Sequence, residues 1–113
     1  MNTYILYKEA ITISSIKITV IKKSFDEDLA NMYLTDGVGA GPCPIFEVGN
    51  QYIIGDEFEA PSGFCTWAWQ DIFYVVHTLR NGGSFDPWIN RKGTQVVCCS
   101  DAIRPICFLI ERI

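Results

Sequence analysis

The stretch that decides the fold is FCTWAWQDIFYVVHTLR, residues 64–80, which is followed by Asn81-Gly82-Gly83. Apolar residues recur in this stretch at the three- and four-residue spacing of a helix face. That face consists of Ala68, Ile72, Val75 and Leu79, and it is widened by Trp69, Phe73 and Val76. The asparagine and glycines end the helix. So much apolar surface predicts the central helix of the domain, packed across a sheet.

The segments that flank this helix favour β-strands. The chain has 15 isoleucines against five leucines, and branching at Cβ suits a strand better than a helix. The expected strands cover residues 16–22, 45–48, 51–54, 94–99 and 106–112. Gly49-Asn50 suits a tight hairpin, and Phe58 is expected to continue the sheet. Pro105 fits the start of the last strand, because proline cannot donate a hydrogen bond inside a sheet.

Together these elements predict an α+β fold, a mostly antiparallel sheet with one short and one long helix. The short helix is expected over residues 25–34, because Ser24 and Glu27 have the S-x-x-E spacing of a capping box. The glycine-rich run at 37–41 is predicted to be a loop, since no Lys-Ser or Lys-Thr follows it as in a phosphate-binding loop. Residues 16–113 are expected to form a single domain, and residues 1–15 an N-terminal extension or an extra strand.

The overall composition excludes several classes of protein. The chain has 113 residues, 49% of them hydrophobic, and 13 acidic against nine basic side chains. The high share of hydrophobic residues and the low share of charged ones, 19%, exclude a wholly disordered chain. The net charge of −4 argues against binding to nucleic acid or to an anionic membrane, since both carry dense negative charge.

The N-terminal sequence predicts a cytoplasmic protein. Lys8, Glu9 and Lys17 interrupt its apolar residues, so neither a signal peptide nor a membrane span is expected. In the reducing cytoplasm, thiols stay free, bind metal or take part in redox chemistry.

The five cysteines are Cys43, Cys65, Cys98, Cys99 and Cys107. An odd number cannot pair completely within one chain, and no two of them have C-x-x-C spacing. Cys65 is the strongest candidate for a reactive thiol, because the unpaired N–H groups of a helix start favour thiolate. Burial beside Phe64 and Trp67 acts in the opposite direction and leaves core packing as the alternative. Cys98 and Cys99 are expected on opposite faces of the sheet, and Cys107 within it.

No recognisable catalytic motif is present. His77 is the single histidine, and it lies about 18 Å from Cys65 along the predicted helix at ~1.5 Å per residue. It is therefore expected to be a surface residue, and a cysteine hydrolase would lack its base. General acid–base catalysis would depend on Asp56, Asp71, Asp86 or Asp101, and no two of these residues have a spacing that predicts a catalytic pair. A local contact to an anion could come from Arg80, Arg91, Lys92 or Arg104, which are too scattered in the sequence to form a patch.

Aromatic residues are concentrated in the second half of the chain. A helix cannot bury every side, so some of them are expected to line a pocket or to form a surface for a partner. The candidates are Trp67, Trp69 and Trp88.

The order of short motifs over residues 16–113 resembles an uncharacterised family of small prokaryotic cysteine-containing proteins. The motifs are Ile16-Lys17-Ile18-Thr19-Val20, Gly41-Pro42-Cys43-Pro44, Gly55-Asp56-Glu57-Phe58, Gly63-Phe64-Cys65, Ala68-Trp69, Leu79-Arg80-Asn81-Gly82-Gly83, Pro87-Trp88, Cys99-Ser100-Asp101 and Arg104-Pro105-Ile106-Cys107-Phe108. The resemblance assigns no activity. It implies that Cys43, Cys65 and Cys99 are the motif cysteines, with Asp56 and Asp101 beside them. Ser100 stands where many relatives have proline.

Three hypotheses for the function follow. In a binding or accessory module, Cys43, Cys65 and Cys99 would hold a soft transition metal such as zinc, or would flank a pocket for a small ligand. In an enzyme, Cys65 would act as a nucleophile or redox thiol, with Cys43 or Cys99 as the resolving thiol. In an interaction module, the aromatic surface would bind a protein partner or a second copy of the chain as a homo-oligomer. The missing base favours the binding module.

Overall fold

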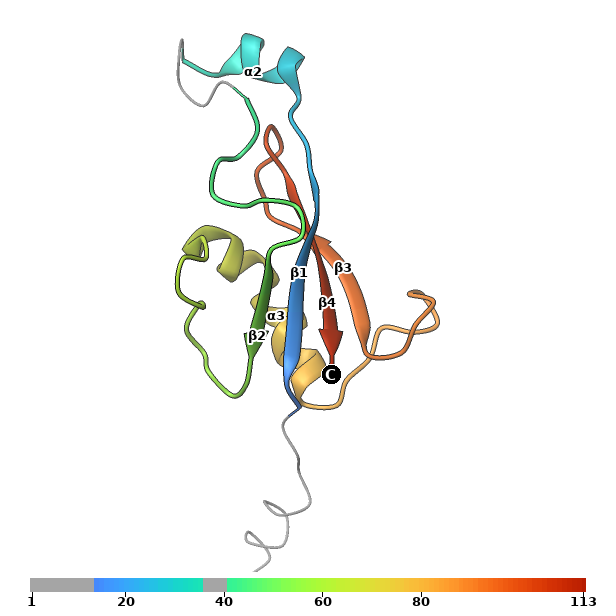
Figure 1. The fold of residues 1–113 in the computed structure, drawn as a ribbon. Helices are drawn as coiled ribbons and strands as arrows, with labels where there is room; N and C mark the ends of the chain where they lie inside the picture. The colour runs from blue at the N-terminus through green and yellow to red at the C-terminus, as the bar shows by residue number, and fades with distance from the viewer. Residues whose placement is uncertain (1–13, 36–40) are drawn as a thin grey trace, which may run out of the picture.

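The computed structural model describes residues 14–35 and 41–113 (Figure 1). In these residues it has four strands and two helices: β1 (Ile16–Lys23), α2 (Glu27–Tyr33), β2 (Gln51–Ile54), α3 (Thr66–Arg80), β3 (Thr94–Cys98) and β4 (Ile106–Arg112). The strands form one sheet in the order β2-β1-β4-β3, and every neighbouring pair is antiparallel. The predicted α+β fold with one short and one long helix is confirmed.

The two central strands carry the core on alternate residues. Ile18 of β1 lies opposite Ile110 of β4, and both are buried on the face that α3 covers. Because side chains alternate between the faces of a strand, Lys17 and Glu111 share the other face and form an ion pair at 3.8 Å. The alternation therefore places Ile16, Ile18 and Val20 of β1 in the core, whereas Ile21 is exposed.

Helix α3 crosses the covered face of the sheet (Figure 1). Ile72, Val75 and Leu79 have no exposed surface, as their spacing predicts. The indole Nε1 of Trp69 donates to the carbonyl of Phe58 at 2.9 Å. The helix begins at Thr66 rather than at Phe64, because Cys65 is its N-cap residue and has extended backbone angles.

The start of the short helix was predicted wrongly. Helix α2 begins at Glu27, and its N-cap is Asp26, whose side chain accepts from the backbone N–H of Leu29 at 3.0 Å. Ser24 lies two residues before this cap, and its backbone N–H donates to the carbonyl of Pro105 at 3.1 Å. This bond, together with one from Asp26 N–H to the carbonyl of Ile103, holds the segment extended beside the loop that precedes β4.

The predicted strand over 45–48 is absent from the described residues, and β2 pairs with β1 instead. Gly49 has a φ of +96°, and the side chain of Asn50 accepts from the N–H of Glu47 at 2.9 Å. These contacts form a turn in place of a two-stranded hairpin. Phe58 does not continue the sheet, since it lies in a loop with an exposed ring.

Two predictions fall largely outside the described residues. Residues 1–13 contain most of the expected N-terminal extension, and 36–40 contain most of the glycine-rich loop. Of the extension, Ser14 is described, and its N–H donates to the carbonyl of Arg80 at 3.0 Å. Within 14–35 and 41–113, neither helix combines the length and the apolar character needed to cross a bilayer.

Candidate functional site

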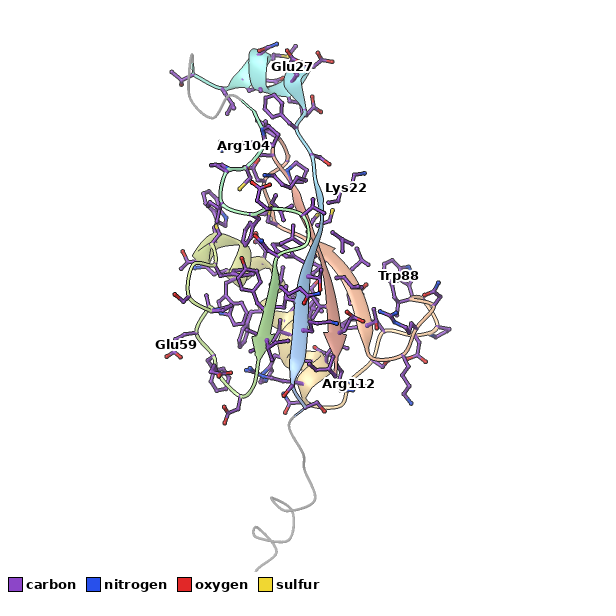
Figure 2. All side chains as sticks on the ribbon, in the orientation of Figure 1. Lys22, Glu27, Glu59, Trp88, Arg104 and Arg112 are labelled. Carbon is purple, nitrogen blue, oxygen red and sulfur yellow. The ribbon has the colours of Figure 1, made fainter. Side chains whose placement is uncertain are left out.

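A cavity of about 590 Å³ lies at the N-terminal end of α3. Three segments that are distant in the sequence enclose it. They are the loop 43–46, the start of α3 from Cys65 to Asp71, and the connection from Cys99 to Ile106 between β3 and β4. Figure 2 shows Arg104 of this connection at the end of the sheet near α2, away from Trp88 at the right-hand edge of the view. The cavity volume lies within the range typical of small-molecule sites.

Apolar core residues form the floor of this cavity. Phe46, Ala68 and Ile106 all line it and are almost completely buried. Phe46 fixes the loop 43–46 to the core, since its ring packs edge-on at 4.9 Å from the ring of Phe64 and at 5.3 Å from that of Phe108. Edge-to-face contacts of this kind favour one orientation of the rings. The floor is therefore held by the same packing that holds the domain.

The three cysteines singled out by the motif resemblance all line the cavity. Cys43, Cys65 and Cys99 are each half-buried against the core. The sulfur of Cys65 accepts from the N–H of Ala68 at 3.5 Å, and that of Cys99 from the N–H of Ile106 at 3.4 Å. Both sulfurs thus act as acceptors for backbone groups at the ends of elements, which fixes their positions on the wall.

Although they share one cavity, these cysteines do not form a metal-ligand cluster. Within residues 14–35 and 41–113, no group of three or more histidine, cysteine, aspartate or glutamate side chains is placed to hold a metal ion. The expected three-thiolate site for a metal such as zinc requires Zn–S distances of about 2.3 Å around one point. The cysteines line separate parts of a wall rather than surrounding such a point.

Polar groups form the rim on the side of the connection between β3 and β4. The carboxylate of Asp71 accepts from the N–H of Ser100 at 2.7 Å. One oxygen of Asp101 accepts from the N–H groups of Ile103 and Arg104, both at 2.9 Å, and the other from the Nε of Arg104 at 3.3 Å. These bonds hold the connection in one conformation. Among the described residues, the two terminal nitrogens of the Arg104 guanidinium have no hydrogen-bond partner.

The Asp101 carboxyl is held in its ionised form. Partial burial acts to raise the pKa of Asp101, but the N–H groups of Arg104 and Ile103 and the Arg104 guanidinium outweigh it and lower that pKa below its ordinary value. A carboxylate that accepts several N–H groups behaves in this way, because the bonds stabilise the charged form. The rim therefore keeps the Asp101 carboxylate paired with Arg104, beside a second carboxylate, that of Asp71.

The other residues predicted for the site lie elsewhere, except Trp67, which lines the cavity with 72% of its surface exposed. Trp69 is a core residue, and Trp88 is an exposed residue of the loop before β3. Asp56 lies at the C-terminal end of α3, away from the cavity. Its neighbour Gly55 accepts a hydrogen bond there from the guanidinium of Arg80 through its carbonyl. His77 is exposed, as predicted, and its ring stacks on Phe73 at 5.5 Å.

Sequence reasoning missed the role of Phe46 and the convergence of Asp71 and Arg104 on the rim. The segment Asp101-Ala102-Ile103-Arg104 did contain a signal, because an aspartate often accepts from N–H groups two and three residues later. The burial of Phe46 had no local signal, since the residues around it have no clear period.

Comparisons with models of protein families, with curated proteins and with solved structures give no match for this chain. The family resemblance therefore rests on the motifs alone, and the function has to be argued from the geometry.

Proposed function

We propose that this protein is a small cytoplasmic binding module that takes a small, mainly apolar molecule with an acidic group into the cysteine-lined cavity. The observation that carries this proposal is the convergence of three distant segments on one cavity of about 590 Å³ with an apolar floor. Pockets of this size with a few placed polar groups are the usual form of a small-ligand site.

Arg104 supports the acidic group in the proposed ligand. Its Nε is bonded to Asp101, and its two terminal nitrogens have no partner within the described residues. A guanidinium fixed through one nitrogen still offers donors that match a carboxylate. Asp101 orients Arg104 through the Nε alone, so the carboxylate of a ligand could bind to the terminal nitrogens while the bond to Asp101 is kept.

The cavity favours binding over hydrolysis by cysteine. The single histidine of the chain, His77, does not line it. Asp71 and Asp101 do line it, but their carboxylates accept hydrogen bonds from N–H groups of the connection between β3 and β4, so neither is placed beside Cys65 as the base that activates a thiol. The alternative of a reactive Cys65 remains a prediction. It requires that one cavity thiol react with iodoacetamide much faster than the exposed Cys98.

A comparison of octanoate with 1-octanol tests the proposal. Both have the same apolar chain, but only octanoate can pair with a guanidinium. We expect octanoate to bind more tightly, and Arg104→Gln to weaken octanoate binding about tenfold while leaving octanol binding nearly unchanged, since a hydrogen bond to a charged group contributes about 1.5–3 kcal/mol. Isothermal titration calorimetry measures both affinities.

The matched control is Arg91→Gln. Arg91 also pairs with a carboxylate, at 2.7 Å from Glu111, but it does not line the cavity. We expect this variant to bind octanoate like the unaltered protein. Absence of octanoate and octanol binding in all three proteins would contradict the proposal and leave the interaction module as the stronger hypothesis.

A further inference from the structure

Two cysteines outside the cavity lie directly opposite each other on neighbouring strands. Cys98 ends β3, and its partner in the antiparallel register is Cys107 of β4. Residues opposite each other in a sheet point to the same face. The neighbours of this pair, Cys99 and Ile106, line the cavity, so Cys98 and Cys107 point to the other face, which α3 does not cover.

The backbone hydrogen bonds show which kind of pair this is. The N–H of Cys99 donates to the carbonyl of Ile106 at 3.1 Å, and that of Arg112 to the carbonyl of Gly93 at 2.8 Å. Hydrogen-bonded pairs alternate with non-bonded pairs along an antiparallel ladder, so Cys98 and Cys107 form a non-hydrogen-bonded pair. In such a pair the Cα atoms are about 4.5 Å apart, which lies within the range of about 4.4–6.8 Å that a disulfide requires.

The two thiols are close to each other and accessible. Cys98 is exposed and Cys107 is half-buried. Burial, the neighbouring thiol of Cys107 and the charge of Asp71 all raise the pKa of Cys98, while Lys22 of β1 lies opposite Cys107 on its other side. A raised pKa leaves little thiolate at neutral pH, so the pair reacts slowly with oxidants.

We propose that Cys98 and Cys107 form a reversible redox site, in which hydrogen peroxide oxidises the two thiols to a disulfide between the strands. One thiol loses its proton, and the resulting thiolate attacks a peroxide oxygen, which breaks the O–O bond and gives a sulfenic acid and hydroxide. The hydroxide takes up the proton and leaves as the first molecule of water. The second thiol attacks the sulfenic sulfur, the S–S bond forms, and a second molecule of water leaves. The two thiols give up two electrons, which reduce the peroxide. A dithiol such as dithiothreitol reverses the reaction by exchange.

This disulfide would close the base of the connection that forms the cavity rim. Cys98 and Cys107 directly flank Cys99 and Ile106, which are the first and last cavity residues of that connection. The bond would fasten the edge strand β3 to β4 at this point. The inference rests on strand register and does not depend on what the cavity binds.

Peptide mapping of the full-length protein tests the proposal. The reduced protein is treated with excess hydrogen peroxide, the remaining thiols are blocked with iodoacetamide, and cleavage before Asp101 separates Cys98 from Cys107. We expect a product lighter by two hydrogen atoms, in which Cys98 is joined to Cys107 and the other three cysteines are alkylated. Dithiothreitol should restore five alkylated cysteines, and the oxidised protein should have a higher Tm than the reduced one.

Single substitutions distinguish this pair from other thiols. Cys98→Ser and Cys107→Ser should each abolish the intramolecular product, whereas Cys99→Ser, one residue along the same strand, should retain it. A disulfide that joins two cavity cysteines, a disulfide between two molecules through Cys98, or over-oxidation of Cys98 with Cys107 still alkylated would each overturn the proposal.

Discussion

The two ends of helix α3 use the space beneath them in different ways. At the C-terminal end, the Arg80 side chain fills the gap between the helix and the loop 55–58 and is only 1% exposed. Its guanidinium donates to the carbonyls of Gly55 and Glu57 and lies 4.9 Å from the centre of the Phe58 ring. At the N-terminal end, no side chain of residues 14–35 or 41–113 takes that place, and a cavity of about 590 Å³ remains.

Under the proposed function, this difference separates a structural arginine from one that is available to a ligand. The bonds of the Arg80 guanidinium to backbone carbonyls stabilise the fold, and its burial keeps it out of reach of a ligand. Arg104 at the other end is held through its Nε alone within the described residues. An open cavity of this size with an apolar floor is the form that small-ligand sites commonly take, which supports the proposed function.

Removing the Arg80 side chain, which fills the C-terminal end, should have the largest effect on stability. Arg80→Ala leaves two carbonyls without partners and an empty volume beside Phe58 and Phe73, so we expect the free energy of unfolding to fall by about 3–5 kcal/mol. Urea denaturation followed by circular dichroism measures it. Arg91→Ala is the control, because this exposed arginine should change stability by less than about 1 kcal/mol. Equal effects of the two substitutions would mean that Arg80 does not hold the loop.

The N-cap of α3, Cys65 at the cavity end, should contribute less to stability than Arg80 does. Because the sulfur of Cys65 accepts from the N–H of Ala68, Cys65→Ala should lower the free energy of unfolding by about 1 kcal/mol. Cys65→Ser replaces the sulfur by another capping acceptor and should stay within about 0.5 kcal/mol of the unaltered protein. Both are measured by urea denaturation. If alanine and serine destabilised equally, the sulfur would not act as a cap.

The smallest effect concerns the charge on the rim and depends on pH. The pKa of Asp101 is lower in the folded protein than its ordinary value, so its contribution is complete above the unfolded pKa of about 4 and is lost as the pH falls through the folded pKa. Asp101→Asn keeps an acceptor for the N–H groups of Ile103 and Arg104 but not the charge. It should therefore be slightly less stable at pH 7 and converge with the unaltered protein in acid. A difference that persists unchanged at pH 2 would contradict this assignment.

The two ends also differ in how far the sequence predicts them. The apolar spacing of Ile72, Val75 and Leu79 predicts α3 and its burial, because a helix imposes a period that the side chains must follow. The start of α2 was not predictable in the same way. Ser24 and Asp26 are both good caps, and the choice depends on hydrogen bonds to Ile103 and Pro105, which lie far away in the sequence.

The cavity was predicted only in part. The motif resemblance selects Cys43, Cys65 and Cys99, and these three do line it. Asp56 was selected in the same way but lies at the other end of α3. A resemblance of short motifs carries no distances, so it could not indicate that Phe46 forms the floor or that Arg104 reaches the rim.

The most direct test of the central claim is a titration of the ¹⁵N-labelled protein with octanoate, followed by amide chemical shifts. Binding at the open end of α3 predicts saturable shifts at residues 43–46, 65–71 and 99–106, with none around Arg80 and the loop 55–58. No saturable shifts, or shifts spread equally over both ends of the helix, would contradict the claim that the cavity is a ligand site.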